Sequence, residues 1–301
     1  MGQCGICGGP TLRHLQCNKI ILMRCQKCGV IAQDPIPLQK TVQSWYQMFY
    51  SDRGTRFSPF AELLVTFFRY RRAAFVRHRS RPGRVLDVGF SRGLMLTRLK
   101  QFGWQSYGIT NSPNAFRHGK SLGLHVYQGM LFGAKFHANF FQVVTFWHVL
   151  EHLRDPAAYL REAHRILSPE GVLIIEVPNI GSPTARWFGC RWLALDLPRH
   201  IFHFSPRSLR WAIEDAGFHV ERMHYFSLEH SIFSLLQSMM NAVTGTQNVL
   251  LESFKYGNTI PQIQRITHAL LGMLLLPIAA IGALLLGIAG RGDIMRMEAR
   301  K

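Results

Sequence analysis

A turn of small residues follows a short apolar run near residue 85 and carries an acidic side chain. The run Val85–Val88 predicts a buried parallel strand, and the turn Gly89–Gly93 leads from it into a helical apolar pattern. Unpaired backbone N–H groups in such a turn predict a cradle for a polar or anionic cofactor group, with Asp87 beside it. A dinucleotide fingerprint would need glycines where Ser91 and Leu94 stand.

Four cysteines near the N-terminus form two C-x-x-C pairs that are separated by 17 residues. This spacing is typical of a closed four-thiolate zinc site, which organises a small ribbon and leaves no open position for a substrate. We therefore expect one structural zinc on Cys4, Cys7, Cys25 and Cys28. Because no secretory signal precedes Cys4, we expect Cys17 and Cys190 to be buried, reduced thiols in a cytosolic setting.

Histidines cluster in two segments that predict proton-transfer chemistry. The string His148-Val-Leu-Glu-His152 also matches inverted zinc proteases, but those need a long helix, whereas this string follows a predicted buried strand. Histidine suits the removal of a proton from an acceptor group. We take His152 as the first candidate base, with Glu151 beside it and with His200 and His203 as rivals. A structural role in a loop is the alternative for each histidine.

Strands and helices must alternate to position these residues. Apolar runs predict strands at 85–88, 104–109, 124–127, 140–146, 171–177 and 218–226. Helical patterns lie between most of them, at 94–99, 114–122, 156–167 and 206–216. The alternation predicts an α/β domain with a parallel, doubly wound sheet, whose ligand lies beyond the carboxyl ends of the strands.

The turn at Asp87 resembles the first motif of class I S-adenosylmethionine (SAM) methyltransferases, in which alternating glycines follow an acid. The segments 146–156, 176–179 and 198–218 resemble the same family. The resemblance implies a Rossmann-like, seven-stranded sheet whose last strand is antiparallel and lies between the fifth and sixth strands. Residues 293–301 are its candidate. The chain resembles bacterial enzymes with an N-terminal zinc ribbon, which act on sugars, envelope polysaccharides or lipid-linked intermediates. It resembles ubiquinone-biosynthesis O-methyltransferases more distantly.

The resemblance implies SAM as the cofactor and assigns its contacts to eight positions. Acids of the family are replaced on the ribose side by Thr110 and Asn111 and on the adenine side by Met130, and Ser91 replaces the middle glycine. These replacements weaken cofactor binding, because each charge-assisted hydrogen bond contributes about 1–3 kcal/mol. The expected cofactor-binding residues are Asp87, Gly89, Ser91, Gly93, Thr110, Asn111, Met130 and His148.

The net charge of +18 indicates an anionic partner. Seven arginines fall between Arg69 and Arg84, so we expect an anionic membrane surface or a phosphorylated substrate there; a solvated basic face is the alternative. Nucleic acid is an unlikely partner, because Phe146-Trp-His-Val149 occupies the place where base-methylating enzymes of this fold carry an Asp/Asn-Pro-Pro-aromatic tetrad.

The segment Ala269–Gly290 is a run of 22 residues without a charge, long enough at roughly 33 Å to cross a bilayer as one helix. Pro277 interrupts it between two glycines, so we expect two short helices in a hairpin. This hairpin either dips into one leaflet from the cytoplasmic face or packs as a hydrophobic platform beside the active site. A single span is less expected, because it would separate residues 291–301 from their sheet. Leu228–Val243 is a candidate interfacial helix. For the run Ala269–Gly290, a buried core hairpin or a dimer interface is the alternative.

We therefore divide the chain into a zinc ribbon (1–35), a basic helical linker (36–81), a methyltransferase domain (82–227), a hydrophobic membrane-associating insert (228–290) and the last strand (291–301). The expected function is SAM-dependent methyl transfer to a small-molecule, sugar or lipid-linked acceptor at the membrane surface, in cell envelope biosynthesis. Two alternatives stand beside it: a degenerate SAM-fold protein that only binds a membrane or a partner, and an RNA methyltransferase. The sequence does not identify the acceptor atom or the oligomeric state.

Overall fold

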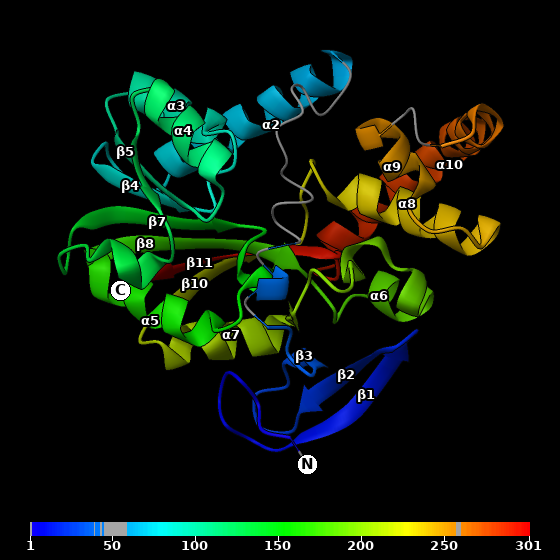
Figure 1. Cartoon of the computed structure of the whole chain (residues 1–301), viewed down its shortest axis with the longest axis horizontal. Coiled ribbons are helices and arrows are strands. Elements are labelled where there is room, and N and C mark those ends of the chain that lie inside the picture. The colour runs from blue at the N-terminus through cyan, green and yellow to red at the C-terminus, as the bar shows by residue number, and fades with distance from the viewer. Residues whose placement is uncertain (1, 39, 43, 45–58, 257–259) are drawn as a thin grey trace.

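The computed structural model describes residues 2–38, 40–42, 44, 59–256 and 260–301, and a seven-stranded sheet forms its centre (Figure 1). The sheet order is β10-β11-β8-β7-β4-β5-β6. Its strands are β4 (Arg84–Val88), β5 (Gln105–Thr110), β6 (His125–Gln128), β7 (Phe141–Trp147), β8 (Leu167–Pro178), β10 (His219–His224) and β11 (Ile294–Arg300).

Strands β4 to β8 run parallel, and β11 is antiparallel to both β8 and β10. The expected α/β sheet is therefore confirmed, including the place of the last strand between the fifth and sixth. Val85, Leu86 and Val144 are fully buried, because helices cover both faces of the sheet and exclude water from the apolar runs.

Helices cover the two faces of the sheet in separate groups. Figure 1 places α2 (Pro59–Arg77), α3 (Leu94–Gln101) and α4 (Pro113–Ser121) above the sheet, and α5 (Pro156–Ile166) and α7 (Pro206–Asp215) below it. The side chains of Ser112, Asp155 and Ser205 cap α4, α5 and α7 by accepting a backbone N–H, which fixes where these helices begin. Short 3₁₀ turns at Leu131–Ala134, Leu150–His152, Gly189–Arg191 and Leu193–Leu195 complete the loops.

The N-terminal ribbon is joined to this domain by a shared sheet. Strands β1 (Thr11–Cys17), β2 (Ile20–Cys25) and β3 (Ile31–Asp34) pair in order, and β3 then pairs with β9 (Phe202–His203) of the domain. The Gln33 amide nitrogen also donates to the carbonyls of Pro198 and His200, at 2.7 Å each. The ribbon therefore supports the histidine-bearing loop and is not a detached module.

The expectation that Cys17 and Cys190 are separate thiols is wrong. Cys17 ends β1 and Cys190 lies in the turn after α6 (Pro183–Phe188), and a disulfide joins them across 173 residues of sequence. The pairing was hidden because only the docking of the ribbon brings these two segments together.

The segment between β10 and β11 folds into three helices: α8 (Ser231–Thr244), α9 (Val249–Tyr256) and α10 (Gln262–Ile288). The predicted hairpin is wrong, because α10 runs as one helix of 27 residues with Pro277 inside it. It packs along α8 through small residues, among them Gly272 and Ala279, and this tertiary packing offsets the helix-breaking effect of proline. Much of α8 is buried against its neighbours in the insert.

The expected linker, residues 36–81, lies partly outside the described residues, since positions 39, 43 and 45–58 are not described. Its described end, α2, packs against α3 of the domain that follows. This position brings Arg69 and Arg72 of α2 to the carboxyl edge of the sheet.

Candidate active site

A cavity of about 430 Å³ opens at the carboxyl ends of β4, β5 and β7. Its floor is the turn after β4, and its walls come from α2, the segment after β7 and the loop after β10. It lies where parallel α/β sheets bind their ligands. The predicted residues that line it are Asp87, Gly89, Ser91, Gly93, Thr110, Asn111, His148 and His152.

Asp87 is a buried carboxylate at the end of β4. The Thr145 hydroxyl donates a hydrogen bond of 2.7 Å to its Oδ1. Burial raises the pKa of Asp87 to about 6, although Thr145, Arg72 and Arg69 act in the opposite direction. A buried carboxylate on a cavity wall is suited to a cationic ligand group, because such a group would compensate the cost of its ionisation.

Two glycines give the turn its shape. Gly89 and Gly93 have φ of +78° and +72°, a region that side chains rarely adopt. A Cβ on Gly89 would lie 2.6 Å from Val149, and one on Gly93 would lie 2.9 Å from Leu124 in the core. The turn therefore needs glycine for its backbone and its packing. Ser91, between them, also has a positive φ of 53°.

The expected ribose and adenine side is only partly assembled. Thr110 is buried at the end of β5, and its hydroxyl accepts a hydrogen bond from the Ser112 N–H at 3.1 Å. Asn111 follows it on the cavity wall and is exposed. Gly129 lines the cavity, but the Met130 side chain does not and is 43% exposed. On this side of the cavity, Thr110, Asn111 and Gly129 therefore line the wall that a ligand would meet, and Met130 does not.

His148 is held between two buried glutamates. Its Nδ1 lies 3.3 Å from Glu151 Oε1, and its Nε2 lies 3.2 Å from Glu176 Oε1. Burial alone would lower the pKa of His148, but the hydrogen bonds and charges of Glu151 and Glu176 raise it to about 9. At neutral pH His148 is therefore protonated and cannot accept a proton. Glu151 points towards it from a buried position and is not part of the cavity wall.

Two arginines of α2 line the cavity, although the sequence pattern predicts them on a basic surface. Arg69 and Arg72 both pair with Glu229, which follows β10, at 2.6 and 2.8 Å. Arg72 also lies over the ring of Trp147, and His230 completes this wall. Long sequence separation hid this ion-pair network. In the sequence, only the position of α2 just before the first strand of the sheet hinted that these arginines reach the cavity.

The three histidines that were candidates for the base, His152, His200 and His203, lie in a row that leads away from the cavity. The rings of His152 and His200 are 4.6 Å apart, and those of His200 and His203 are 6.3 Å apart. Only His152 lines the cavity; His200 and His203 are buried, and burial lowers the pKa of both. His152 Nδ1–H donates to the Arg199 carbonyl at 2.9 Å, which places the lone pair of the neutral ring on Nε2.

The four N-terminal cysteines come together in the ribbon. Their sulfur atoms lie within 4.8 Å of one another, with Sγ–Sγ distances of 3.7 Å for Cys4–Cys28 and 3.4 Å for Cys7–Cys25. A tetrahedral zinc with bonds of about 2.3 Å needs sulfur atoms about 3.8 Å apart, so the donor set fits such a metal.

A family of methyltransferase domains matches residues 60–222, which is more than half of the chain. The chain belongs to the class I SAM-dependent methyltransferases. A ubiquinone biosynthesis O-methyltransferase of Xanthomonas axonopodis pv. citri is 30% identical over 166 residues, which cover 50% of this chain and 69% of that protein. The protein of the same description from Xanthomonas oryzae pv. oryzae is 31% identical over 132 residues, which cover 40% of this chain and only 55% of that protein.

The likeness to solved structures concerns the fold alone. A SAM-dependent methyltransferase from Archaeoglobus fulgidus superposes with a TM-score of 0.50 at 20% identity, over 86% of this chain and 98% of that one. The family assignment makes this chain an enzyme with SAM as its cofactor, as the turn at Asp87 had indicated.

Proposed function

We propose that this enzyme transfers a methyl group from SAM to a small or lipid-linked acceptor at a membrane surface. The observation that carries the proposal is the cavity at Asp87, which lies in the same domain as a long helix with an exposed apolar face. The small-molecule chemistry of the ubiquinone biosynthesis relatives supports the acceptor class.

The chain's residues fit SAM at three points. The Asp87 carboxylate offers a counter-charge to an ammonium group, and the open turn at Gly89–Gly93 leaves room for close approach of the cofactor. Thr110 and Asn111 supply neutral hydrogen-bonding groups on the ribose side. SAM itself supplies an activated methyl group; the protein has to align the acceptor with it and exclude water.

Cofactor affinity is expected to fall as the pH is lowered through about 6. The pKa of Asp87 is about 6 in the ligand-free protein, so its carboxylate is charged above this pH and protonated below it. A positively charged ammonium binds the charged form, which makes affinity constant above pH 6 and progressively weaker below it. Calorimetric titration with SAM between pH 5 and pH 8 measures this dependence.

Asp87→Asn is the matched variant, since it keeps the volume and removes the charge. It should weaken SAM binding about 10–100-fold at pH 7.5, the loss of one charge-assisted hydrogen bond, and remove the dependence near pH 6. An unchanged pH profile in Asp87→Asn would show that another group controls binding.

His152 is our proposed base. Its Nε2 carries the lone pair, it lines the cavity, and the protonated His148 beside it cannot take this role. For an acceptor hydroxyl or acidic carbon, His152 would remove the proton as the methyl group is transferred. Glu151 then acts through His148, and His200 packs behind His152 as a positioning residue.

We further propose that the four ribbon cysteines hold one structural zinc. All four donors are thiolate-forming groups, and the site is closed, so the metal stabilises the ribbon and takes no part in methyl transfer. Through β3, Gln33 and the segment 198–204, the ribbon also supports the carbonyl of Arg199 that orients His152.

Within the part of the chain that the structure describes, α10 is the one helix long and apolar enough to cross a membrane. We propose that it lies along the surface instead. Hydrogen bonds of Ser238 and Asn241 tie α8 to the 3₁₀ turns at 189–195, and α10 packs along α8. The opposite face of α10 is an exposed apolar strip: Ile263, Ile266, Leu270, Met273, Leu274, Leu276, Ile278, Ile281, Leu284, Leu285 and Ile288.

The double variant Ile281→Glu/Leu285→Glu is expected to detach the protein from membranes. Burial of each large apolar side chain contributes about 1.5–3 kcal/mol, so the loss of both should lower vesicle binding at least about tenfold. Flotation with anionic lipid vesicles measures the bound fraction. Leu63→Glu, at a position 67% exposed on α2, is the control and should float like the parent; equal flotation of all three proteins would contradict a membrane-binding α10.

Methyl transfer to lipid tests the proposed function. Purified protein is incubated with methyl-labelled SAM and a lipid extract of its own cells, and the label in the organic phase is counted. We expect labelled lipid. Label on added RNA would favour the RNA methyltransferase, and SAM binding without transfer to any fraction would favour the degenerate binding protein.

A further inference from the structure

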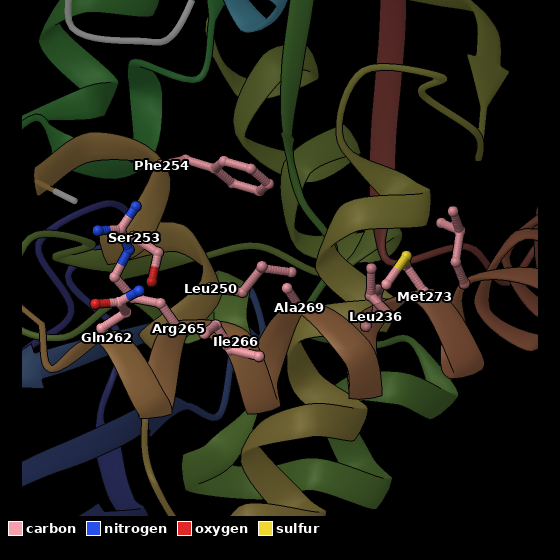
Figure 2. Close-up of a pocket in the computed structure, with 11 residues that line it drawn as sticks. Leu236, Leu250, Ser253, Phe254, Gln262, Arg265, Ile266, Ala269 and Met273 are labelled. Atoms are coloured by element: carbon pink, nitrogen blue, oxygen red, sulfur yellow. The ribbon is translucent and has the colours of Figure 1, made fainter.

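A second cavity, of about 570 Å³, lies between α8, α9 and α10. Figure 2 shows its lining, and we call it the insert groove. Its size falls within the range of about 300–1,000 Å³ that is usual for ligand sites. None of the described residues lines both this groove and the cofactor cavity. The groove is built by the segment between β10 and β11, which lies beyond the family match at residues 60–222.

The insert groove is apolar along its length and polar at one end. Side chains of Leu236, Leu250 and Met273 form the apolar part. Ser253, Gln262 and Arg265 gather at the other end (Figure 2). This division matches an amphiphile, with a hydrocarbon chain in the trough and a polar head beside the guanidinium.

Arg265 gives the groove a preference for a negative head. It is the only residue of α10 with a permanent charge. Among the described residues, no carboxylate forms an ion pair with it. Arginine binds phosphate through paired, directional N–H donors, so a phosphate-bearing head complements this end of the groove.

The insert groove lies between the exposed apolar strip of α10 and the cofactor cavity. Ile266 and Met273 belong both to the groove lining and to the exposed apolar strip of α10. On the other side, Leu250 of α9 lines the groove while its neighbour Leu251 lines the cofactor cavity. A lipid in the groove would thus have its chain continuous with the bilayer and be separated from the methyl-transfer site by one helix.

We propose that the insert groove binds the hydrocarbon chain of a phosphate-bearing lipid acceptor, with Arg265 at its phosphate. This inference rests on the proposed function and names the substrate class of the enzyme. The bilayer supplies the acceptor, and α9 separates the groove from the cofactor cavity.

Photolabelling tests the groove directly. Full-length protein is bound to phosphatidylcholine vesicles doped with hexadecyl phosphate that carries a diazirine on its chain, and mass spectrometry locates the adducts after irradiation. We expect adducts on Leu236 and Leu250, inside the groove. A hexadecanol probe with the same diazirine should label these residues less, because it lacks the phosphate.

Two pairs of variants sharpen the test. Ala269→Phe fills the groove at an exposed position and should lower groove labelling about tenfold or more, whereas Leu274→Phe, on the outward face, should leave it unchanged. Arg265→Gln should lower labelling by the phosphate probe alone, and Arg291→Gln, beyond the end of α10, should not. Equal groove labelling in Ala269→Phe and Leu274→Phe, or adducts confined to the outward face, would overturn the proposal.

Two further readouts separate the possible failures. Sedimentation reports whether Ala269→Phe turns a dimer into a monomer; that result would make a second copy the occupant and overturn a lipid site. SAM titration of the same samples reports on the cofactor site. If Ala269→Phe loses groove labelling but keeps SAM binding and methyl transfer, the groove is not the acceptor site and only the groove proposal fails. If the parent shows groove labelling but does not bind SAM, the proposed function fails.

Discussion

The Cys25→Ser variant is expected to purify without zinc and with a ribbon that proteases cleave readily. A structural zinc in a four-thiolate site contributes about 10–16 kcal/mol of binding energy to the folded ribbon, and the loss of one thiolate opens the site. Cys25 is almost completely buried between β2 and the turn that follows, so water cannot replace its sulfur without opening the ribbon. Metal analysis of protein purified without chelator should fall from one zinc per chain to near zero.

The same variant should lose methyl transfer, because the ribbon supports the loop that orients His152. Gln33 donates to the carbonyls of Pro198 and His200, which flank the Arg199 carbonyl that accepts the His152 hydrogen bond. Cys190→Ser is the control, since it breaks the disulfide but leaves the four zinc ligands in place. Zinc retained at one per chain in Cys25→Ser would remove these four cysteines as the metal site.

His152→Ala is expected to lower turnover about 10²–10⁴-fold while the Kd for SAM changes little. The imidazole lines the cavity, and its Nε2 is the acceptor nitrogen of a ring fixed by the Arg199 carbonyl. Initial rates of label transfer to the lipid extract, measured across pH, are the readout. A base that must be unprotonated to act gives the parent's rate a rising limb at low pH, and this limb should disappear in the variant.

His137→Ala controls for the loss of a histidine at an exposed site outside the cavity and should keep the parent's rate. Equal losses of SAM affinity and turnover in His152→Ala would make His152 a structural residue. His200→Ala with the larger loss of turnover would transfer the role of base to the next ring in the row.

The parallel centre of the sheet was predictable because strands such as Val85–Val88 are apolar runs buried on both faces, and such runs are local in sequence. The place of the antiparallel last strand followed from the resemblance to the methyltransferase family. The ribbon was predictable for a similar reason, since two C-x-x-C pairs at this spacing are a local pattern typical of a small ribbon closed by four thiolates. The turn at Gly89–Gly93 was predictable because it follows a buried apolar run and carries glycines at a characteristic spacing. The cavity opens at this turn.

The failures concern contacts between residues far apart in the chain. Arg69 and Arg72 looked like part of a basic surface, because nothing local shows that Glu229 lies opposite them. The Cys17–Cys190 disulfide depends on the docking of the ribbon. Pro277 argued for two helices, but the packing of α8 along α10 outweighs a local preference of about 3 kcal/mol.

Calorimetric titration of the full-length protein with SAM, and with its demethylated product, tests most directly whether the cavity at Asp87 is a cofactor site. We predict one site per chain, with a Kd well below 1 mM for both ligands and weaker binding in Asp87→Asn. A Kd weaker than about 1 mM for both, which corresponds to barely 4 kcal/mol, would contradict the cofactor site and favour a degenerate protein that binds membranes without catalysis.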